Sequence, residues 1–319
     1  MKIMTWLLVA PGFVWAVLRL GGWDRGILVQ LLSFTTYVAA WSWLPLIFAL
    51  ARRQWLAAAV ALVAAGALTV AVLPRTLSGK SPATGVRLQV MTSNMLLGGA
   101  DPQTVVELVR EHDIDVLALQ EFSPATEAGL KAAGLEELLP YSSLGAEAGA
   151  SGSGLYSRFP ITDPGVSRNG GGFNQAYGTI TPPGAQPLLV ESAHPAAPYA
   201  VRALPDWHAD LLAEPHADPR GTARILLGDF NATLDHAELR DLISHGYRDA
   251  AAAVGAGLVP TWGIYHGPRR FPPITIDHVL VDERIGVRQV QVHRIPRSDH
   301  RSVLAWLTVP AAAATPEAK

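Results

Sequence analysis

The 319-residue sequence contains no cysteine. A disulfide framework, a thiolate nucleophile and a cysteine-ligated zinc or iron–sulfur site are therefore excluded. Charged residues are also scarce, at 16% of the chain, and they nearly balance to a formal net charge of −2. There is no dense stripe of lysine and arginine, so the composition does not predict a strong electrostatic field for nucleic acid.

Charge is sparsest in the first quarter of the sequence. Between Met1 and Leu73 the charged residues lie between apolar runs and not inside them: Lys2, Arg19, Asp24, Arg25, Arg52 and Arg53. The three apolar runs are residues 4–20, 27–50 and 55–73, each close to the roughly 20 residues that cross a bilayer core as a helix. Residues 1–73 are therefore predicted to be a membrane anchor of about three transmembrane helices.

The orientation of this anchor rests on few residues. Pro11 and Gly12 in the first run suit a re-entrant or signal-like segment as well as a membrane helix, but the apolar run that follows at once favours retained helices. Arg52 and Arg53 occupy the short turn between the second and third runs, which favours a cytoplasmic turn. We therefore expect a multi-pass protein of the cell membrane with its large domain extracytoplasmic. Four basic residues on the expected outer side oppose this orientation: Arg19, Arg25, Arg75 and Lys80.

The sequence pattern changes after the apolar runs. Residues 74–85 are rich in proline, glycine, serine and threonine, which predicts a linker. Residues 86–309 contain short β-like runs with turns and helices between them, and Asp101 followed by Pro102 indicates a helix start. Strands outnumber long helices, which predicts an α/β sandwich with mixed sheets. The tail, residues 310–319, is predicted to be disordered.

Polar residues follow the ends of several predicted strands, where a rigid backbone can hold a site open to substrate. They are Asn94, Glu121, His194, Asp229, Asn231, Asp277, Asp299 and His300. Singly, each has an ordinary structural explanation: Asp229 and Asn231 suit an Asx turn, and Glu121 suits a helix cap. Their joint occurrence favours a functional site.

The motifs that contain these residues resemble a known family. In chain order they are TSN, LQE, GLYSR, AHP, GDFNA, IDHV and SDHRSV, and they resemble the endonuclease/exonuclease/phosphatase superfamily, to which deoxyribonuclease I-like nucleases belong. The resemblance covers almost all of residues 86–309. It implies a four-layer α/β/β/α sandwich with two mixed β-sheets, and a metal-dependent phosphoric ester hydrolase that uses Mg²⁺, with Mn²⁺ as a substitute.

The resemblance also implies roles for the oxygen-bearing residues. Glu121 would be the principal Mg²⁺ ligand, assisted by Asn94, and Asp299 would complete the metal or water network. Asp229 would orient or deprotonate the attacking water, and Asn231 would help to place the phosphate. The residue chemistry agrees, because Mg²⁺ binds hard oxygen ligands and phosphoester hydrolysis needs charge stabilisation and an aligned water.

Two histidines are implied to face the phosphate. His300, held by Asp277, would contact the scissile phosphate as the imidazolium. His194 would stabilise the transition state, although its motif continues as AHPAAP, where soluble nucleases of the family usually have a Thr-His pair. His278 follows Asp277 on the same strand and should point to the opposite face, which predicts a structural role. The remaining histidines are predicted to lie at the surface or in loops: His112, His208, His216, His236, His245, His266 and His293.

Three functional hypotheses follow. The first is a membrane-anchored phosphatase or pyrophosphatase that acts on a lipid-linked phosphate, such as undecaprenyl pyrophosphate, at the outer membrane face; the architecture is similar to that of bacterial members linked to teicoplanin-type resistance. The second is an extracytoplasmic metal-dependent nuclease. The third is a scaffold without catalysis, which the intact residue set opposes. The expected partners are a phosphorylated lipid and the bilayer; nucleic acid is less favoured, and no obligate protein partner is predicted.

Overall fold

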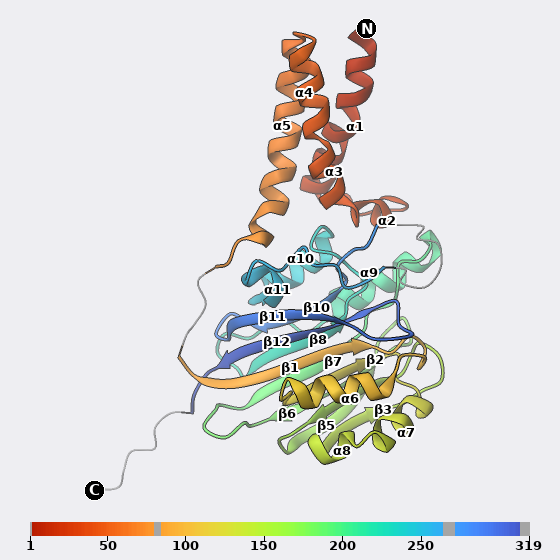
Figure 1. Ribbon diagram of the computed structural model, residues 1–319, viewed down its shortest axis with the longest axis vertical. Coiled ribbons are helices and arrows are strands. Elements are labelled where there is room, and N and C mark those ends of the chain that lie inside the picture. The colour runs from red at the N-terminus through yellow and green to blue at the C-terminus, as the bar shows by residue number, and fades with distance from the viewer. Residues whose placement is uncertain (1, 80–83, 264–271, 313–319) are drawn as a thin grey trace, which may run out of the picture.

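The computed structural model describes residues 2–79, 84–263 and 272–312. Within them two six-stranded sheets lie face to face (Figure 1). The first has the order β11-β12-β1-β2-β4-β3 and consists of β1 (Val86–Asn94), β2 (Val116–Gln120), β3 (Tyr141–Gly145), β4 (Ser153–Ser157), β11 (Gly286–Arg294) and β12 (Arg301–Val309). The second has the order β5-β6-β7-β8-β10-β9 and consists of β5 (Ile161–Arg168), β6 (Asn174–Ile180), β7 (Leu188–Ala193), β8 (Ala223–Asp229), β9 (Tyr247–Asp249) and β10 (Asp277–Asp282).

Both sheets mix parallel and antiparallel pairs. β1 runs parallel to β2 and antiparallel to β12, and β7 runs parallel to β8, which is antiparallel to β10. Alternate side chains of each strand point between the sheets. Leu88 and Val90 of β1 thus share one buried core with Val190 of β7 and with Ile225 and Leu227 of β8. Burial of these side chains holds the two sheets together.

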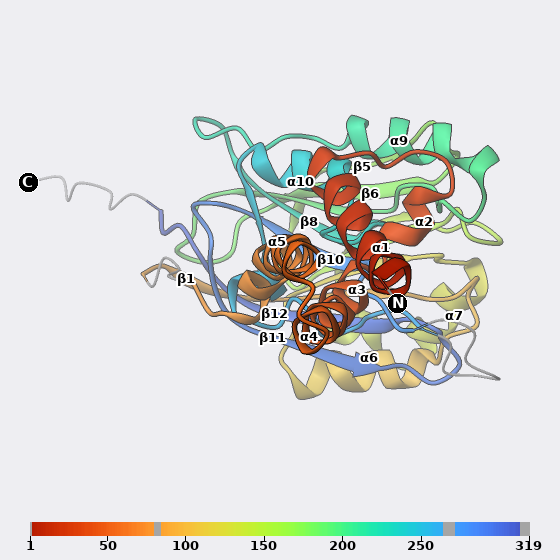
Figure 2. The same ribbon diagram turned by 90° about the horizontal axis from the view of Figure 1, so that it is seen from above.

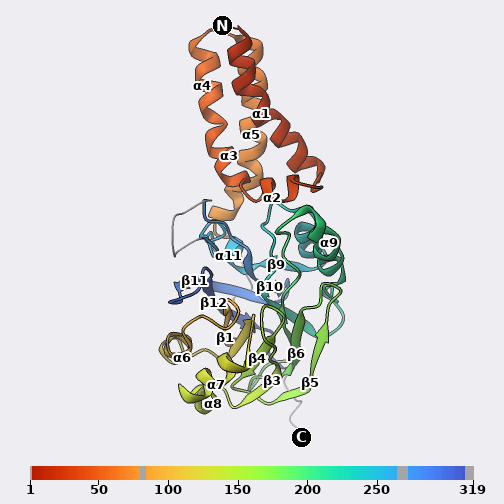
Figure 3. The same cartoon turned by 90° about the vertical axis from the view of Figure 1, so that its right-hand side faces the viewer.

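Helices cover the outer faces of the two sheets (Figure 3). On the first sheet lie α6 (Pro102–Glu111), α7 (Pro124–Ala132) and α8 (Leu135–Leu138). On the second, the short 3₁₀ helix η2 (Val201–Ala203) leads into α9 (Leu204–Ala213), followed by α10 (Ala237–Ser244). The short helix α11 (Ala250–Ala253) packs against the core between the sheets. α6 begins as expected, since the Asp101 carboxylate accepts a hydrogen bond from the Thr104 amide. The predicted four-layer α/β/β/α sandwich with two mixed sheets is confirmed.

The amino-terminal region forms a helical bundle that projects from the sandwich (Figures 1 and 2). It contains α1 (Lys2–Gly21), α2 (Leu28–Leu32), α3 (Thr35–Trp41), α4 (Trp43–Ala51), α5 (Trp55–Val72) and the 3₁₀ helix η1 (Leu73–Thr76). By length and composition, Lys2–Gly21 and Trp55–Thr76 could cross a membrane, whereas Thr35–Ala51 is a shorter apolar helix. The run expected to form one span, residues 27–50, is therefore divided, and α2 lies at the base of the bundle.

Contacts with the sandwich explain why α2 is separate. Val29 is fully buried among the side chains that pack under α9 and α10, and its carbonyl oxygen lies 2.8 Å from Nε2 of His236. His236 lies in the loop that precedes α10, one of the two predicted settings, but it is 1% exposed and not at the surface. Two further hydrogen bonds join this region to loops of the sandwich: the Gln30 amide donates to the Pro198 carbonyl at 2.6 Å, and the Tyr37 hydroxyl donates to the Pro273 carbonyl at 2.6 Å.

A buried ion pair fastens the bundle at a second point. Asp235, just before α10, accepts hydrogen bonds from Arg19 at the end of α1 (2.7 Å) and from Arg75 in η1 (2.6 Å). All three side chains are buried. The first residues of the segment predicted as a linker are thus ordered against the sandwich, whereas residues 80–83 of it lie outside the described residues. Most of the predicted disordered tail, residues 313–319, also lies outside them, although Ala311 pairs with Ala185.

Asp235 should therefore make stability depend on pH. Burial alone would raise the pKa of Asp235, but Arg75 and Arg19 outweigh it and hold the pKa below its usual value. A carboxylate whose pKa is lower in the folded state stabilises the fold above its unfolded pKa and loses this effect as pH falls through the folded pKa. Unfolding monitored by circular dichroism should accordingly show acid destabilisation that begins below about pH 4.

Asp235→Asn tests this assignment. Removing one partner of a buried charge pair should lower the free energy of unfolding at pH 7 by about 3–5 kcal/mol and flatten the acid limb. Asp241→Asn, at an exposed position of α10, is the matched control and should leave both unchanged within about 0.5 kcal/mol. Equal stability of the two variants at pH 7 would contradict a structural role for Asp235.

Candidate active site

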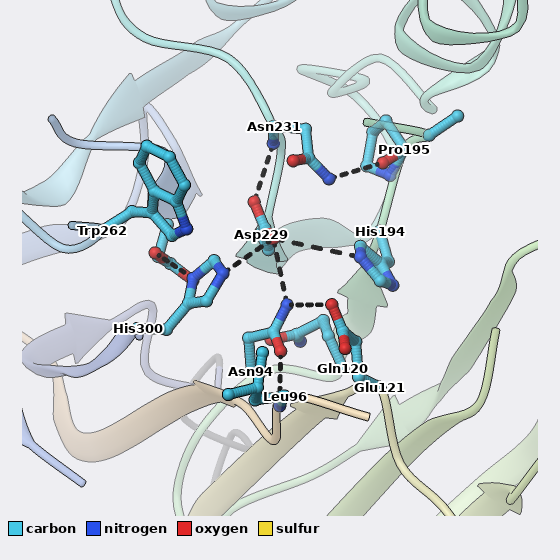
Figure 4. A network of polar contacts seen from close by, with 12 residues as sticks. Asn94, Leu96, Gln120, Glu121, His194, Pro195, Asp229, Asn231, Trp262 and His300 are labelled. Carbon is cyan, nitrogen blue, oxygen red and sulfur yellow. Dashed lines mark hydrogen bonds and ion pairs between the residues drawn. The ribbon is translucent and has the colours of Figure 1, made fainter. Parts of the chain in front are cut away.

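The predicted site residues converge at one edge of the sandwich (Figure 4). Asn94 ends β1 and Glu121 follows β2, and these parallel strands end at the same edge. Asp229 ends β8, Asp277 begins the antiparallel neighbour β10, and the two residues pair in register. His300 directly precedes β12, which is antiparallel to β1. Strand direction alone thus brings residues from both sheets together.

Asp229 is the centre of the hydrogen-bonded network. Its Oδ2 accepts a hydrogen bond from Asn94 Nδ2 at 3.0 Å, and its Oδ1 accepts one from the Asn231 amide at 2.8 Å. The same Oδ2 lies 3.7 Å from Nε2 of His300 and 3.9 Å from Nε2 of His194. Asp229 therefore faces both histidines, as its predicted role in handling the attacking water requires.

Burial shifts the acidity of Asp229 strongly. The side chain is 2% exposed, and burial raises its pKa to about 7, against the opposing effect of His300. The carboxylates of Asp277 and Glu121 raise this pKa further. A carboxylate with a pKa near the working pH can accept a proton from water and release it again.

His300 and Asp277 form a buried charge pair. Nδ1 of His300 lies 3.0 Å from both carboxylate oxygens of Asp277. Burial alone would lower the pKa of His300, but Asp277 and Asp229 outweigh it and raise the pKa to about 10. The ring is therefore an imidazolium at neutral pH, and its Nε2–H can donate to an anionic oxygen.

The pKa of His194 is shifted in the opposite direction to that of His300. Burial, together with the charge of His300, lowers its pKa to about 3, so this imidazole is neutral at physiological pH. Its backbone amide donates to Oε1 of Gln175 at 2.7 Å, and Asn169 donates to its carbonyl at 3.0 Å. The ring packs edge-on against Phe173, with ring centres 4.8 Å apart. The glycine-rich segment at residues 168–174 thus helps to position His194. The role of Gln175 was not foreseen, because no motif in the sequence contains it.

Local backbone geometry also serves the site. Glu121 and Asn231 have φ angles of +54° and +50°, a region that costs energy for residues other than glycine and is held by surrounding contacts. The Trp207 indole donates to the Asn231 carbonyl at 3.1 Å. Gly228 precedes Asp229 because a Cβ there would lie 1.9 Å from the Ala193 carbonyl oxygen. This close approach of β7 and β8 places His194 beside Asp229.

Trp262 has a role that the sequence did not indicate. Its Nε1 donates a hydrogen bond to Oδ2 of Asp299 at 3.1 Å. Oδ1 of Asp299 is buried and has no hydrogen-bond partner among the described residues, and it lies 3.9 Å from Nε2 of His300. Trp262 thereby fixes the carboxylate of Asp299 beside the histidine.

The acidic residues fit a cation better on the Glu121 side than on the Asp277 side. Asp229, Asp277 and His300 have ligand atoms within 4.8 Å of one another. However, both carboxylate oxygens of Asp277 already contact Nδ1 of the charged His300 ring. The positive charge of this ring would repel a metal ion. Burial and the nearby Asp299 raise the pKa of Glu121, although Asn94 and the Leu97 amide donate to its oxygens. A divalent cation between Glu121 and Oδ1 of Asp299 would relieve the repulsion between these two carboxylates.

His278 lies on the other face of β10, as predicted. Its Nδ1 is 2.8 Å from the Asp249 carboxylate and its Nε2 is 2.9 Å from the Ala232 carbonyl oxygen. The ring is fully engaged behind the site and does not face Asp229. A further feature of the sequence, the Arg269–Arg270 pair, lies outside the described residues.

Comparison with known proteins identifies the family. The family model described as "Endonuclease/Exonuclease/phosphatase family" matches residues 91–300, more than half of the chain. The chain belongs to this family. Endonuclease/exonuclease/phosphatase enzymes hydrolyse phosphoesters, and the predicted enzyme class, a phosphoric ester hydrolase, is confirmed. Comparison with curated proteins gave no significant match.

Solved structures share the fold at low sequence identity. An endonuclease/exonuclease/phosphatase from Beutenbergia cavernae is 19% identical, with a TM-score of 0.57 over 72% of this chain and 73% of that one. TDP2 from D. rerio, complexed with a single-strand DNA product, is 15% identical, with a TM-score of 0.55 over 70% and 99%. Sphingomyelinase C from Streptomyces griseocarneus is 18% identical, with a TM-score of 0.51 over 69% and 99%.

Asp277→Asn tests the part that the His300–Asp277 charge pair plays in catalysis. Loss of the carboxylate removes the main charge that keeps His300 protonated, so hydrolysis of a soluble probe, bis(p-nitrophenyl) phosphate, should fall roughly 10²–10⁴-fold. Asp163→Asn, at an exposed position of β5, is the control and should retain full activity. Near-normal turnover by Asp277→Asn, with an unchanged melting temperature, would refute the role of the charge pair.

Trp262→Phe should have a smaller effect of the same kind. It keeps the ring but removes the donor to Asp299, which predicts a loss of roughly tenfold in kcat/KM with little change in melting temperature. Trp306→Phe, a half-buried tryptophan of β12 that packs under α6, is the matched control. Equal kinetics of the two variants would leave Trp262 with a packing role only.

Proposed function

We propose that this chain is a membrane-anchored, divalent-metal-dependent phosphoesterase that hydrolyses a lipid-linked phosphate or pyrophosphate at the outer face of the cell membrane. The single observation that carries the choice of a lipid substrate is the contact between α2–α3 and the rim of the site. Gln30 binds the loop that follows His194, and Tyr37 binds the segment that precedes Asp277. The base of the helical bundle and the entrance loops are thus joined directly.

Each polar group in the network has a task in this reaction. Asp229 accepts a proton from the attacking water, while Asn94 and the Asn231 amide keep its carboxylate oriented. The charged Nε2–H of His300 donates to an oxygen of the scissile phosphate. Neutral His194 can donate one further hydrogen bond without adding charge. Together these donors stabilise the negative charge of the phosphoryl oxygens in the transition state.

The oxygen ligands fit a hard divalent cation. Glu121, Asn94 and Asp299 would hold it, and Mg²⁺ is the ion that carboxylate and amide oxygens favour, with Mn²⁺ as a substitute. When bound, the cation supplies charge neutralisation at the phosphate oxygens. With these three residues as cation ligands, Asp277 remains paired with His300, and Asp229 remains available to orient the attacking water.

The buried ion pair at the junction removes one objection to an outward-facing domain. Arg19 and Arg75 counted against this orientation as basic residues on the outer side. Both bind Asp235, so they have a structural reason to lie there. With Arg52 and Arg53 at the far end of the bundle, this supports three membrane crossings and an extracytoplasmic site. Membership of a teicoplanin-resistance-type subgroup, and with it a contribution to antibiotic resistance, is consistent with this arrangement.

The alternative is an extracytoplasmic nuclease with the same catalytic residues. It is favoured by one observation: a structure with the same fold, D. rerio TDP2, was solved with a single-strand DNA product. A nuclease must contact several phosphates along a groove, usually with basic residues, and should bind less tightly as salt rises. The near-neutral charge of this chain argues for the lipid substrate.

A two-substrate assay decides between them. The full chain in neutral detergent with Mg²⁺ is offered undecaprenyl pyrophosphate and, separately, plasmid DNA. We expect release of inorganic phosphate from the lipid, no nicking of the plasmid, and loss of activity with EDTA. Glu121→Gln should reduce phosphate release by at least about 10²-fold without unfolding the protein. Rapid nicking without phosphate release would replace the lipid phosphatase with the nuclease.

A further inference from the structure

A cavity of about 690 Å³ lies at the junction between the bundle and the sandwich, apart from the catalytic residues. We call it the arginine pocket, because Arg19, Arg75, Arg240 and Arg248 all line it. Its lining residues come in part from the end of α5 and from α10 and α11. Figure 1 shows the end of α5 above these two helices. No residue assigned to the phosphoester site lines it, so its charges need a separate explanation.

Positive charge exceeds negative charge at the centre of this pocket. Asp235 is the shared carboxylate of Arg19 and Arg75. Arg240 donates only to the backbone carbonyls of Asp235 and Arg19, and among the described residues no carboxylate lies within ion-pair distance of it. Burial, with repulsion from Arg19, lowers the pKa of Arg240 to about 10. A bound anion would relieve both the burial and the repulsion.

The neighbouring acids offset only part of this positive charge. Asp24 and Asp235 raise the pKa of Arg240 against the effects of burial and Arg19, so two carboxylates face the three guanidinium groups of Arg19, Arg75 and Arg240. Asp249 lies 2.8 Å from His278. Glu283, the remaining acid of the lining, is exposed. Arg248 offers a further donor, since its Nε is buried without a hydrogen-bond partner among the described residues.

Part of the remaining lining is apolar. Ala71, Leu77 and Ile243 contribute to it, and Val70 near the end of α5 and Leu73 at the start of η1 are exposed nearby. A ligand that fills the pocket would thus place an anionic group near Arg240 and hydrocarbon against α5. Guanidinium groups bind phosphate oxygens with particular strength. The combination matches a phosphate diester that carries acyl chains.

We propose that the arginine pocket binds the phosphate head group of an anionic membrane phospholipid at the base of the bundle. The inference rests on the membrane location of the helices in the proposed function, but it is independent of the reaction at the catalytic residues. A lipid bound there would bridge α5 and α10, and it would hold the sandwich at the level of the head groups.

Native mass spectrometry of the full chain in neutral detergent tests this. Phosphatidylglycerol should bind, phosphatidylcholine should bind at least about tenfold more weakly, and inorganic phosphate should not displace the lipid at equal concentration. Similar affinity for both lipids would overturn the role of the arginines. Equal binding of inorganic phosphate would refute the lipid as the ligand and would indicate a site for free phosphate.

Two variants locate the binding to this pocket. Arg240→Gln removes the unpaired cation, and Ser244→Glu adds a negative charge at an exposed lining position that the fold tolerates. Each should weaken phosphatidylglycerol binding roughly 10- to 100-fold, whereas Arg220→Gln, at an exposed position outside the pocket, should not. Unchanged binding by Ser244→Glu would refute the site. Turnover of undecaprenyl pyrophosphate, measured separately, should persist in Ser244→Glu, so failure of this inference is distinguishable from failure of the proposed function.

Discussion

The burial of carboxylates beside one another is the constraint on which the catalytic edge depends. Asp229, Asp277 and Glu121 repel one another when ionised, because little water is present to screen their charges. This unfavourable electrostatic energy is offset because each carboxylate accepts hydrogen bonds from its own donors. Asp277 is matched by a charged imidazole, Asp229 by two amides, and Glu121 by an asparagine and a main-chain amide. His300 and His194 differ in protonation for the same reason. Two carboxylates outweigh the effect of burial on the pKa of His300, whereas burial and the positive charge of His300 lower the pKa of His194.

Much of the catalytic edge was predictable because strand direction determines it. Asn94 and Glu121 each follow an apolar strand in the sequence, and parallel neighbours must present these ends at one edge. The ordered motifs then made the family recognisable. Trp262, Gln175 and the loop before His194 were not predictable in the same way, because they act through hydrogen bonds between segments distant in the chain. Such contacts leave no periodic pattern in a single sequence.

The structure of the amino-terminal region was less predictable from the sequence than that of the catalytic edge. Hydropathy identified the apolar runs, but it could not show that residues 27–32 leave the bundle to pack on the sandwich, because a buried Val29 and a lipid-facing valine look alike in sequence. The partner of Arg19 and Arg75 was equally hidden. Asp235 is separated from them by more than 150 residues. In the sequence alone, each arginine looks like the basic residue that commonly follows an apolar helix.

Two separate fastenings, the Arg19–Asp235–Arg75 cluster and the α2 contacts, also determine how the molecule can move. A domain held by one flexible segment of chain can rotate in any direction, whereas two separate fastenings leave rotation only about the line that joins them. If the bundle crosses a bilayer, as proposed, the active site is then confined to a narrow range of heights above the membrane. A lipid-linked substrate would in that case reach the site by lateral diffusion in the plane of the membrane.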